Sequence, residues 1–351
     1  MKLTNLGWNP FFANEYDAFK EGNLEPARIK MEHRGSYEVS TGDYTYVAEI
    51  SGKFRFDVDL REHLPAVGDW VLITPQEGNR AIIHHLLPRK SKFSRKIAGN
   101  TTEEQIVAAN IDTVFLVNAL NQDFNPSRIE RYLVMAWESG ANPVIVLSKA
   151  DLCQDVEEKV QSVSGIAVGV PIHVVSSASG SGIEELALYL TEGTTTALLG
   201  SSGAGKSTLI NKLYGNDIQT VQDIREGDGK GKHTTTSREL IVLQGGGVVI
   251  DTPGMRELQL WETNHISQSF QDIEELSELC YFRDCKHDGE PRCAIEIAIE
   301  EGRLEERRLE NYRKFIRELA FLERRSNKKA QLEERKKWKK LAGDRTRQHR
   351  R

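Results

Sequence analysis

A glycine-rich segment near the middle of the chain could bind phosphate. It has the spacing G-x4-G-K-S and runs from Gly200 to Ser207. Its glycines let backbone N–H groups curl around phosphate oxygens, its lysine adds a positive charge, and its serine hydroxyl can bind Mg²⁺. An apolar run precedes it and a helix-like pattern follows, which disfavours a plain glycine turn. We expect the whole loop and first helical turn to bind a nucleotide: Gly200, Ser201, Ser202, Gly203, Ala204, Gly205, Lys206, Ser207 and Thr208.

Two later segments suit the metal ion and terminal phosphate of that nucleotide. Asp251-Thr252-Pro253-Gly254 follows an apolar strand. Its aspartate can hold Mg²⁺ through water, and its glycine can offer an N–H to the γ-phosphate. Residues 227–236 read GDGKGKHTTT, a glycine-rich, charged loop that ends in hydroxyl groups. Thr235 is the preferred hydroxyl for completing the Mg²⁺ shell, because of its distance from the next strand, and Thr234 is the second choice.

A second motif, earlier in the chain, indicates the base. Residues 147–151 read LSKAD after an apolar strand and resemble the Asn-Lys-x-Asp guanine motif of translation-factor-type GTPases; a charged strand-end turn is the alternative. The Asp151 carboxylate can accept hydrogen bonds from guanine N1–H and the exocyclic amine, a pair that adenine does not offer, and the Lys149 stem can lie over the base. Ser148 replaces the motif's asparagine, so we expect the bracing amide to be lost and affinity to be lower. Ser177 and Ala178 resemble the loop whose N–H contacts guanine O6.

These motifs occur in an unusual order. The base-reading segment precedes the phosphate loop, the threonine loop and the Asp-Thr-Pro-Gly turn, which is a circular permutation of the ordinary GTPase order. A permuted chain can build the same sheet because domain termini lie at the surface, often close together. Met255 stands where many small GTPases place a water-orienting glutamine, so we expect slow intrinsic turnover, on the order of 10⁻³ s⁻¹. His233 is the polar candidate for positioning the water; a solvent-exposed loop residue is the alternative.

Three of the four cysteines gather with a histidine toward the C-terminus. Cys280, Cys285, His287 and Cys293 have the spacing C-x4-C-x-H-x5-C. In a reducing compartment such a cluster is more often a metal site than a set of disulfides. Three thiolates and an imidazole suit a closed, tetrahedral structural Zn²⁺ site, which leaves no position open for catalysis. Scattered core thiols are the alternative.

The composition fits a globular protein. Of 351 residues, 38% are hydrophobic and 28% charged, and no apolar run approaches the roughly 18 residues that cross a bilayer. The first residues lack the basic start and apolar core of a secretory signal, so we expect a cytosolic location. The net charge of −5 hides an asymmetry, because residues 323–351 hold 13 Lys and Arg against 4 Asp and Glu, a balance of +9 that leaves −14 on the other 322 residues. Such a tail suggests either a polyanionic partner or a solvated helix.

Apolar patterning divides the chain into parts. Residues 36–94 contain short alternating runs, including Phe54, Phe56 and Val58, which predict the strands of a small barrel or sandwich. Farther on, buried runs alternate with helix-length stretches, which predicts a mostly parallel sheet covered on both faces. From about residue 296 the charged, proline-free sequence predicts a long helix. The expected sheet strands are 113–117, 144–147, 172–175, 196–199, 240–243 and 248–250.

Together these features resemble one family. The barrel-like start, the permuted order and the stretches GKHTTT, DTPGMREL and CYFRDCKHDGEPRCAI are similar to the ribosome-small-subunit-dependent GTPases, the RsgA family (YjeQ, YloQ), over roughly residues 35–313. The resemblance implies an α/β fold with an N-terminal extension (1–34), an OB-fold RNA-binding β-barrel (35–100), a circularly permuted P-loop GTPase domain (101–275) and a zinc-binding α-helical domain with a basic helical tail (276–351).

The resemblance also implies a function. It implies GTP hydrolysis during late maturation of the small (30S) ribosomal subunit, with GTP/GDP, Mg²⁺ and Zn²⁺ as cofactors and that subunit and its 16S rRNA as partners. We expect a monomer that does not bind membranes.

Two other functions stay open. A metabolic ATPase or kinase could use the same phosphate loop, and an Asp151-dependent preference for GTP would distinguish it. An RNA-binding protein could use GTP only as a ligand, which Met255 permits. For RNA contact we expect the barrel face, the basic C-terminal tail and a basic cluster. The cluster comprises Arg89, Lys90, Lys92, Arg95 and Lys96.

Overall fold

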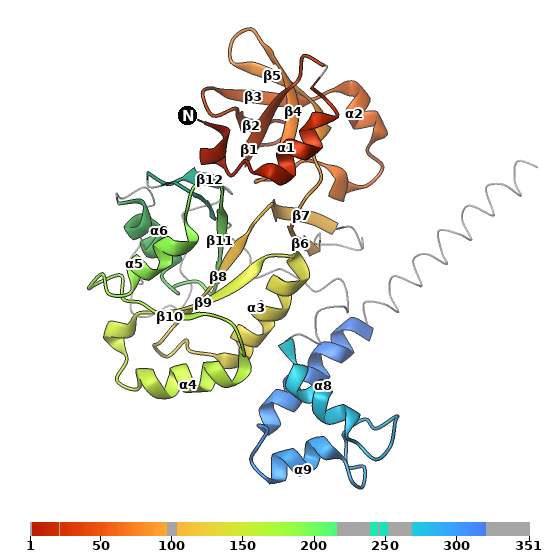
Figure 1. Ribbon diagram of the computed structural model, residues 1–351, viewed down its shortest axis with the longest axis vertical. Coiled ribbons are helices and arrows are strands. Elements are labelled where there is room, and N and C mark those ends of the chain that lie inside the picture. The colour runs from red at the N-terminus through yellow and green to blue at the C-terminus, as the bar shows by residue number, and fades with distance from the viewer. Residues whose placement is uncertain are drawn as a thin grey trace, which may run out of the picture. The chain divides into compact units, whose positions relative to one another are not determined.

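The computed structural model describes residues 2–20, 22–96, 104–215, 239–244, 246–251 and 269–320. The chain forms two compact units, Met1–Gln259 and Leu260–Arg351 (Figure 1). None of the described helices is long and apolar enough to span a membrane.

Five strands of the first unit close into a small barrel. β1 pairs with both β2 and β4, and β3 pairs in parallel with β5, so the order β1-β2-β3-β5-β4 returns to β1. Side chains from all five strands fill its interior. This architecture is that of an OB-like barrel, as the sequence predicted. The strands are β1 (Glu25–Glu32), β2 (Tyr37–Ser40), β3 (Thr45–Ile50), β4 (Trp70–Gln76) and β5 (Arg80–Leu86).

The first strand of the barrel begins well before residue 35, where the sequence analysis placed the start of the barrel. Its sequence EPARIKME has charged residues at four of eight positions, although one of them, Arg28, is fully buried in β1. The Arg28 guanidinium donates hydrogen bonds to the backbone carbonyls of Leu6, Gly68 and Asn110. A cation can be buried when its hydrogen bonds are made in this way, and a strand that contains one does not look like a core strand in a hydrophobicity pattern.

The N-terminal extension also belongs to this core. It forms a short helix η1 (Leu3–Leu6) and the helix α1 (Pro10–Asp17). The side chains of Leu6 and Phe12 pack on the fully buried Trp70, and the Trp8 ring meets the Trp70 ring edge-on at 4.6 Å. The extension therefore covers one side of the barrel.

The segment that contains Phe54, Phe56 and Val58 is not a strand, so this part of the sequence prediction was wrong. Residues Gly52–Asp57 form the helix α2. The Ser51 hydroxyl caps this helix and accepts a hydrogen bond from the Phe54 N–H at 3.1 Å. Phe54 packs on the barrel core, whereas Phe56 is 87% exposed. The alternation of apolar residues therefore did not indicate a buried face of a strand. A short helix η2 (Arg61–His63) follows α2.

A mostly parallel sheet of six strands follows the barrel. Its order is β10-β9-β8-β11-β13-β12, with β12 antiparallel to β13. All six strands lie where the sequence predicted them, and the pair Met31–Glu239 joins β12 to β1 of the barrel. A hairpin of β6 (Lys92–Lys96) and β7 (Glu104–Ala109) precedes the sheet. The sheet strands are β8 (Thr113–Ala119), β9 (Asn142–Ser148), β10 (Ile172–Val174), β11 (Thr195–Gly200), β12 (Glu239–Val242) and β13 (Val248–Asp251).

Both faces of this sheet are buried, as expected. Phe115 and Val117 of β8 pack in one cluster with residues of α5 and α6. Val114 and Leu116, which alternate with them, are equally buried, and α3 contacts β8, β9 and α4 (Figure 1). The helices of this part are α3 (Pro126–Ser139), α4 (Val156–Ile166), α5 (Ile183–Leu186), η4 (Ala187–Tyr189) and α6 (Lys206–Tyr214).

The described part of the second unit consists of helices joined by turns. It contains α8 (Gln271–Glu278), α9 (Ala294–Glu300) and a helix over residues 306–320. The Phe270 ring contacts the rings of Tyr312 and Phe315 at 5.5 and 5.6 Å. The single long helix expected from residue 296 is interrupted at 301–305, because Gly302 adopts a left-handed φ of 72° that ends α9. The basic tail beyond residue 320 lies outside the described residues.

Candidate functional sites

The predicted nucleotide residues follow strands that end at one edge of the sheet. β9 ends at Ser148, β11 at Gly200 and β13 at Asp251. Gly200 pairs with Val117 of β8, and Ser148 pairs with Ala119 two residues farther along β8. Ligands bind outside the carboxyl ends of the strands in open α/β sheets. The fold thus brings the base-reading and phosphate motifs onto neighbouring loops.

The phosphate loop leads from β11 into α6. Gly205 caps the helix with a φ of 89°, and α6 begins at Lys206. A side chain at position 200 has no room, because an added Cβ would lie 2.3 Å from the Val117 carbonyl oxygen. The Lys206 ammonium donates to the carbonyls of Gly200 and Ser201 at 2.8 and 2.7 Å. A helix N-terminus and a lysine on a loop of main-chain groups form a cradle suited to phosphate.

Ser148 connects the base-reading loop to the phosphate loop. Its side chain is almost fully buried, and its Oγ donates a hydrogen bond of 2.6 Å to the carbonyl oxygen of Ala204. The sequence analysis expected a brace to be lost with the asparagine amide. The structure instead shows that the shorter hydroxyl joins the two loops itself.

The other residues predicted to read the base lie beside the loop that follows β10. Lys149 adopts a left-handed φ of 59°, and a short helix η3 (Ala150–Leu152) follows it. The Asp151 Oδ1 atom accepts a hydrogen bond of 2.5 Å from the Ser176 hydroxyl. Ser177 and Ala178 lie in the turn that directly follows Ser176. The Asp151 carboxylate is therefore oriented by the loop that was expected to contact guanine O6.

Asp123 is a residue of this site that the sequence analysis missed. It follows β8, and its carboxylate accepts a hydrogen bond from the Ser201 hydroxyl of the phosphate loop. The same carboxylate pairs with Arg128 at 2.8 Å. A usable signal was its place in a polar turn directly after a buried strand. Gly254, Met255, His233, Thr234 and Thr235 lie outside the described residues.

The four predicted zinc ligands gather in the second unit. The Cys280 Sγ lies 3.6 Å from the His287 Nδ1 and 4.0 Å from the Cys293 Sγ. Separations of this size fit donors placed about 2.0–2.3 Å from a tetrahedral Zn²⁺. Burial lowers the pKa of His287, which favours the neutral imidazole that a metal requires. Burial and the neighbouring thiols raise the pKa of Cys285 to about 12, which a divalent cation would offset. The donor atoms of Cys280, Cys285, His287 and Cys293 all lie within 4.8 Å of one another.

The loop that carries these ligands is fixed by hydrogen bonds. The Glu290 carboxylate accepts from the backbone N–H groups of Lys286 and Asp288 at 3.0 and 2.6 Å. The backbone carbonyl of His287 accepts a hydrogen bond from Arg313 of the helix over residues 306–320. The four donor atoms, and the hydrogen bonds that fix the loop around them, therefore fit a structural metal site.

Comparison with known proteins identifies the family. Residues 86–261 match the model of the RsgA GTPase. The small ribosomal subunit biogenesis GTPase RsgA 1 of Oceanobacillus iheyensis is 45% identical over 339 residues, which cover 94% of this chain and 97% of that protein. The chain belongs to the RsgA GTPase family. The small ribosomal subunit biogenesis GTPase RsgA of Opitutus terrae is 42% identical, over 97% of this chain and 96% of its own length.

Two solved structures show the same permuted architecture as this RsgA family member. YjeQ from Thermotoga maritima is 31% identical, with a TM-score of 0.63, over 85% of this chain and 99% of its own. YloQ, described as a circularly permuted GTPase, is 26% identical, with a TM-score of 0.60, over 85% of this chain and 95% of its own. The chain is therefore a circularly permuted GTPase that binds GTP and GDP.

The basic cluster expected to contact RNA is largely engaged within the protein. Arg89 pairs with the fully buried Asp69 carboxylate at 2.7 Å and is itself only 13% exposed. Lys90 and Lys92 are also paired with carboxylates of the first unit. The side chains of residues 95 and 96 lie outside the described part. Arg89 is thus built into the barrel rather than offered to a partner.

Proposed function

We propose that this chain binds the 30S ribosomal subunit and its 16S rRNA and hydrolyses GTP there, late in maturation of the subunit. The observation that carries the proposal is the hydrogen bond between Ser148 and Ala204, which joins a guanine-type carboxylate loop to a phosphate loop. It occurs in a chain that is 45% identical to a small ribosomal subunit biogenesis GTPase. Such a partner places the protein in the cytoplasm, and we infer that it acts as a monomer.

The proposal gives each part of the nucleotide site a role. Lys206 exchanges the carbonyls of Gly200 and Ser201 for oxygens of the β- and γ-phosphates, while the loop amides hold the remaining oxygens. The Asp151 carboxylate accepts the N1–H and amine hydrogen bonds of guanine, and Lys149 covers the base. The backbone of Ser177 and Ala178 donates to O6.

A second group of residues is proposed to hold Mg²⁺ and to position the water that attacks the γ-phosphate. Ser207, Asp251 and Thr235 would hold Mg²⁺, with Thr234 as the substitute for Thr235, and the ion would offset the charge that develops on the phosphates. Gly254 donates to the γ-phosphate. Binding to the ribosomal subunit completes this Mg²⁺ and water site, and His233 positions the water. If His233→Ala leaves the subunit-stimulated rate unchanged, His233 has no part in the reaction.

Zinc is proposed as a structural cofactor of the second unit. The ligands Cys280, Cys285, His287 and Cys293 would form a closed site, and Zn²⁺ would supply a fixed cross-link between the ends of α8 and α9. The support is the compact donor set and the hydrogen-bonded loop around it.

Two experiments test these assignments. In nucleotide competition, a guanine site predicts that excess ATP fails to displace labelled GTP and that Asp151→Asn removes this selectivity; equal displacement by ATP would favour the metabolic ATPase or kinase. Co-sedimentation with 30S subunits should be stronger with a non-hydrolysable GTP analogue than with GDP and should weaken steeply with salt. Binding that ignores both nucleotide and salt would contradict the proposed partner.

A further inference from the structure

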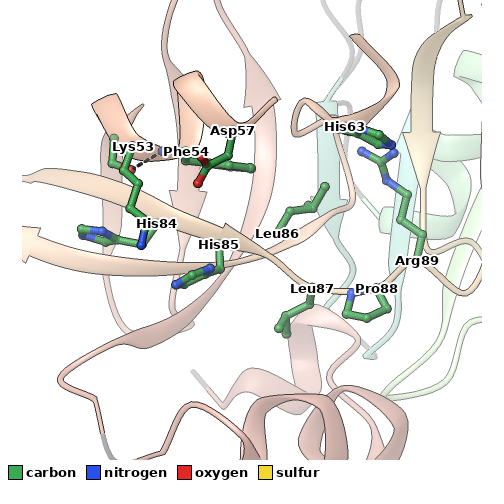
Figure 2. A pocket seen from close by; sticks show the side chains of 11 residues that line it. Lys53, Phe54, Asp57, His63, His84, His85, Leu86, Leu87, Pro88 and Arg89 are labelled. Atoms are coloured by element: carbon green, nitrogen blue, oxygen red, sulfur yellow. Dashed lines mark hydrogen bonds between the residues drawn. The ribbon is translucent and has the colours of Figure 1, made fainter. Parts of the chain in front are cut away.

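A histidine of the edge strand β10 binds the two short helices that follow this strand. The His173 Nδ1 atom lies 2.9 Å from the Glu185 carboxylate of α5, and its Nε2 atom lies 3.0 Å from the Tyr189 hydroxyl of η4. Among the described residues, His173 is the one histidine with a hydrogen-bond partner at both ring nitrogens. By contrast, His84 and His85 line a hollow of the barrel beside α2 (Figure 2). The two bonds fix the orientation of the His173 ring.

The partners of this ring connect it to the centre of the sheet. An ionised carboxylate only accepts hydrogen bonds, so the Nδ1 atom donates to Glu185 and the Nε2 atom can accept from the Tyr189 hydroxyl. The Tyr189 ring packs edge-on against Phe115 of β8 at 5.7 Å. The Tyr189 carbonyl accepts a hydrogen bond from the Thr196 hydroxyl of β11 at 3.3 Å. His173 therefore joins β10 to helices that are fixed on β8 and β11.

The loop over residues 175–182 connects β10 to α5 and contains the backbone groups proposed to contact guanine O6. Its two ends are held together, because the Ser176 N–H donates to the Ser181 carbonyl at 3.0 Å. Gly182 lies so close to β10 that an added Cβ would be 2.2 Å from the Val174 carbonyl oxygen. The loop is thus closed on itself, and its position depends on β10 and α5.

These two elements are too short to fix that position by themselves. β10 has three residues and pairs with β9 alone in the described part of the sheet, and α5 has four residues. A helix of one turn is not stable without tertiary contacts. Leu186 of α5 is buried in the core, but apolar contacts are not directional, whereas hydrogen bonds depend steeply on distance and angle. The two bonds of His173 supply the directional contact between β10 and the short helices.

We propose that His173 is a positioning residue for guanine specificity: it holds the 175–182 loop where a backbone N–H of Ser177 or Ala178 reaches O6 of the base. An N–H···O bond is about 2.7–3.2 Å long and is lost near 3.6 Å, so a loop displacement of roughly 0.6 Å removes the contact. His173 acts through the loop and needs no contact with the nucleotide. The inference rests on the proposed function, because it concerns the same nucleotide site.

The test compares guanine nucleotides that differ at one atom. 6-Thio-GDP carries sulfur, a weaker acceptor, in place of O6, and it keeps the N1–H and amine groups proposed to bind Asp151. GDP, 6-thio-GDP and ADP are each titrated in equilibrium competition with a fluorescent GDP analogue on the full-length chain with Mg²⁺. The ratio of the GDP and 6-thio-GDP affinities reports the O6 contact, and the ratio of the GDP and ADP affinities reports guanine selection as a whole.

Four variants separate positioning from folding. His173→Leu removes both bonds, and Tyr189→Phe removes one bond while keeping the packed ring. Glu185→Gln retains an acceptor for the Nδ1 atom. Glu184→Ala is the matched control, because it removes an exposed carboxylate of α5 that is not bonded to His173. Thermal unfolding of each variant shows whether it folds, and Tyr189→Phe tests the inference if His173→Leu unfolds.

The expected result is a change in selectivity. The unmodified chain binds GDP about fivefold more tightly than 6-thio-GDP, the ratio falls to about one in His173→Leu, and it takes an intermediate value in Tyr189→Phe. Glu185→Gln and Glu184→Ala keep the ratio of the unmodified chain. If His173→Leu and Tyr189→Phe also keep this ratio, or if the unmodified chain binds both guanine nucleotides equally, the inference is overturned while the guanine site stands. Equal affinity of the unmodified chain for GDP and ADP would instead overturn the guanine site itself.

Discussion

Replacing Ser148 by alanine probes the contact between the base-reading and phosphate loops. The change removes a hydrogen bond of 2.6 Å whose serine and whose acceptor residue Ala204 are both almost fully buried. A buried carbonyl that loses its donor costs about 1–3 kcal/mol. Because the brace is present before nucleotide binds, part of this cost appears as lower stability and part as weaker nucleotide binding. We expect the affinity for GDP to fall about tenfold, equivalent to about 1.4 kcal/mol.

The assay measures dissociation of a fluorescent GDP analogue by stopped flow, together with denaturant unfolding of the nucleotide-free chain. The dissociation rate should carry most of the change, because affinity differences between related complexes are mostly differences in dissociation. Ser148→Thr keeps a hydroxyl and should bind GDP close to the original affinity. Ser164→Ala, which removes an exposed serine bonded to the Val160 carbonyl in α4, controls for loss of a hydroxyl elsewhere. If Ser148→Ala changes neither dissociation nor unfolding, the two loops are not coupled through this contact.

Three further predictions follow from other contacts. Ser176→Ala frees the Asp151 carboxylate from a bond of 2.5 Å and should weaken GTP binding by roughly fivefold in an equilibrium titration, whereas unaltered affinity would show that Asp151 needs no support. Cys285→Ser should lose stoichiometric zinc by metal analysis and lower the helical circular dichroism of the second unit; retained zinc would exclude Cys285 as a ligand. Arg28→Met removes a hydrogen-bond donor from three backbone carbonyls, of which only that of Gly68 keeps a further side-chain donor among the described residues, the Asn110 amide. It should lower the free energy of unfolding by about 3 kcal/mol, and a denaturation midpoint within error of the original would show that these bonds do not hold the barrel together.

The parallel sheet could be predicted from the sequence because its signals are local. The strands β8, β9, β11 and β13 are mostly apolar runs buried on both faces, and the base-reading, phosphate and Asp-Thr-Pro-Gly motifs begin at the ends of β9, β11 and β13. The position of Gly200 after β11 and of residues 148–151 after β9 then fixes which edge of the sheet they share. The candidate zinc ligands could also be predicted from the sequence, because three cysteines and a histidine lie within fourteen residues.

The remaining features depend on contacts between distant residues, which spacing does not encode. Arg28 hides the strand β1 because its partners Leu6 and Asn110 lie far away in sequence. The sequence predicted Arg89 to be a cation available for RNA, but in the fold it forms an ion pair with Asp69. Phe56 stands in an alternating apolar pattern that is typical of a strand, but Ser51 caps a helix that contains it. In each case a tertiary contact or a helix cap, and not the local hydrophobic pattern, determined whether the residue is buried, paired or helical.

The measurement that tests the central claim most directly is steady-state GTP turnover by the full chain with purified small and large ribosomal subunits in parallel. The proposed function predicts slow turnover alone, on the order of 10⁻³ s⁻¹, a large increase with small subunits and none with large subunits. Equal stimulation by both subunits, or by neither, would contradict a GTPase that acts on the small subunit.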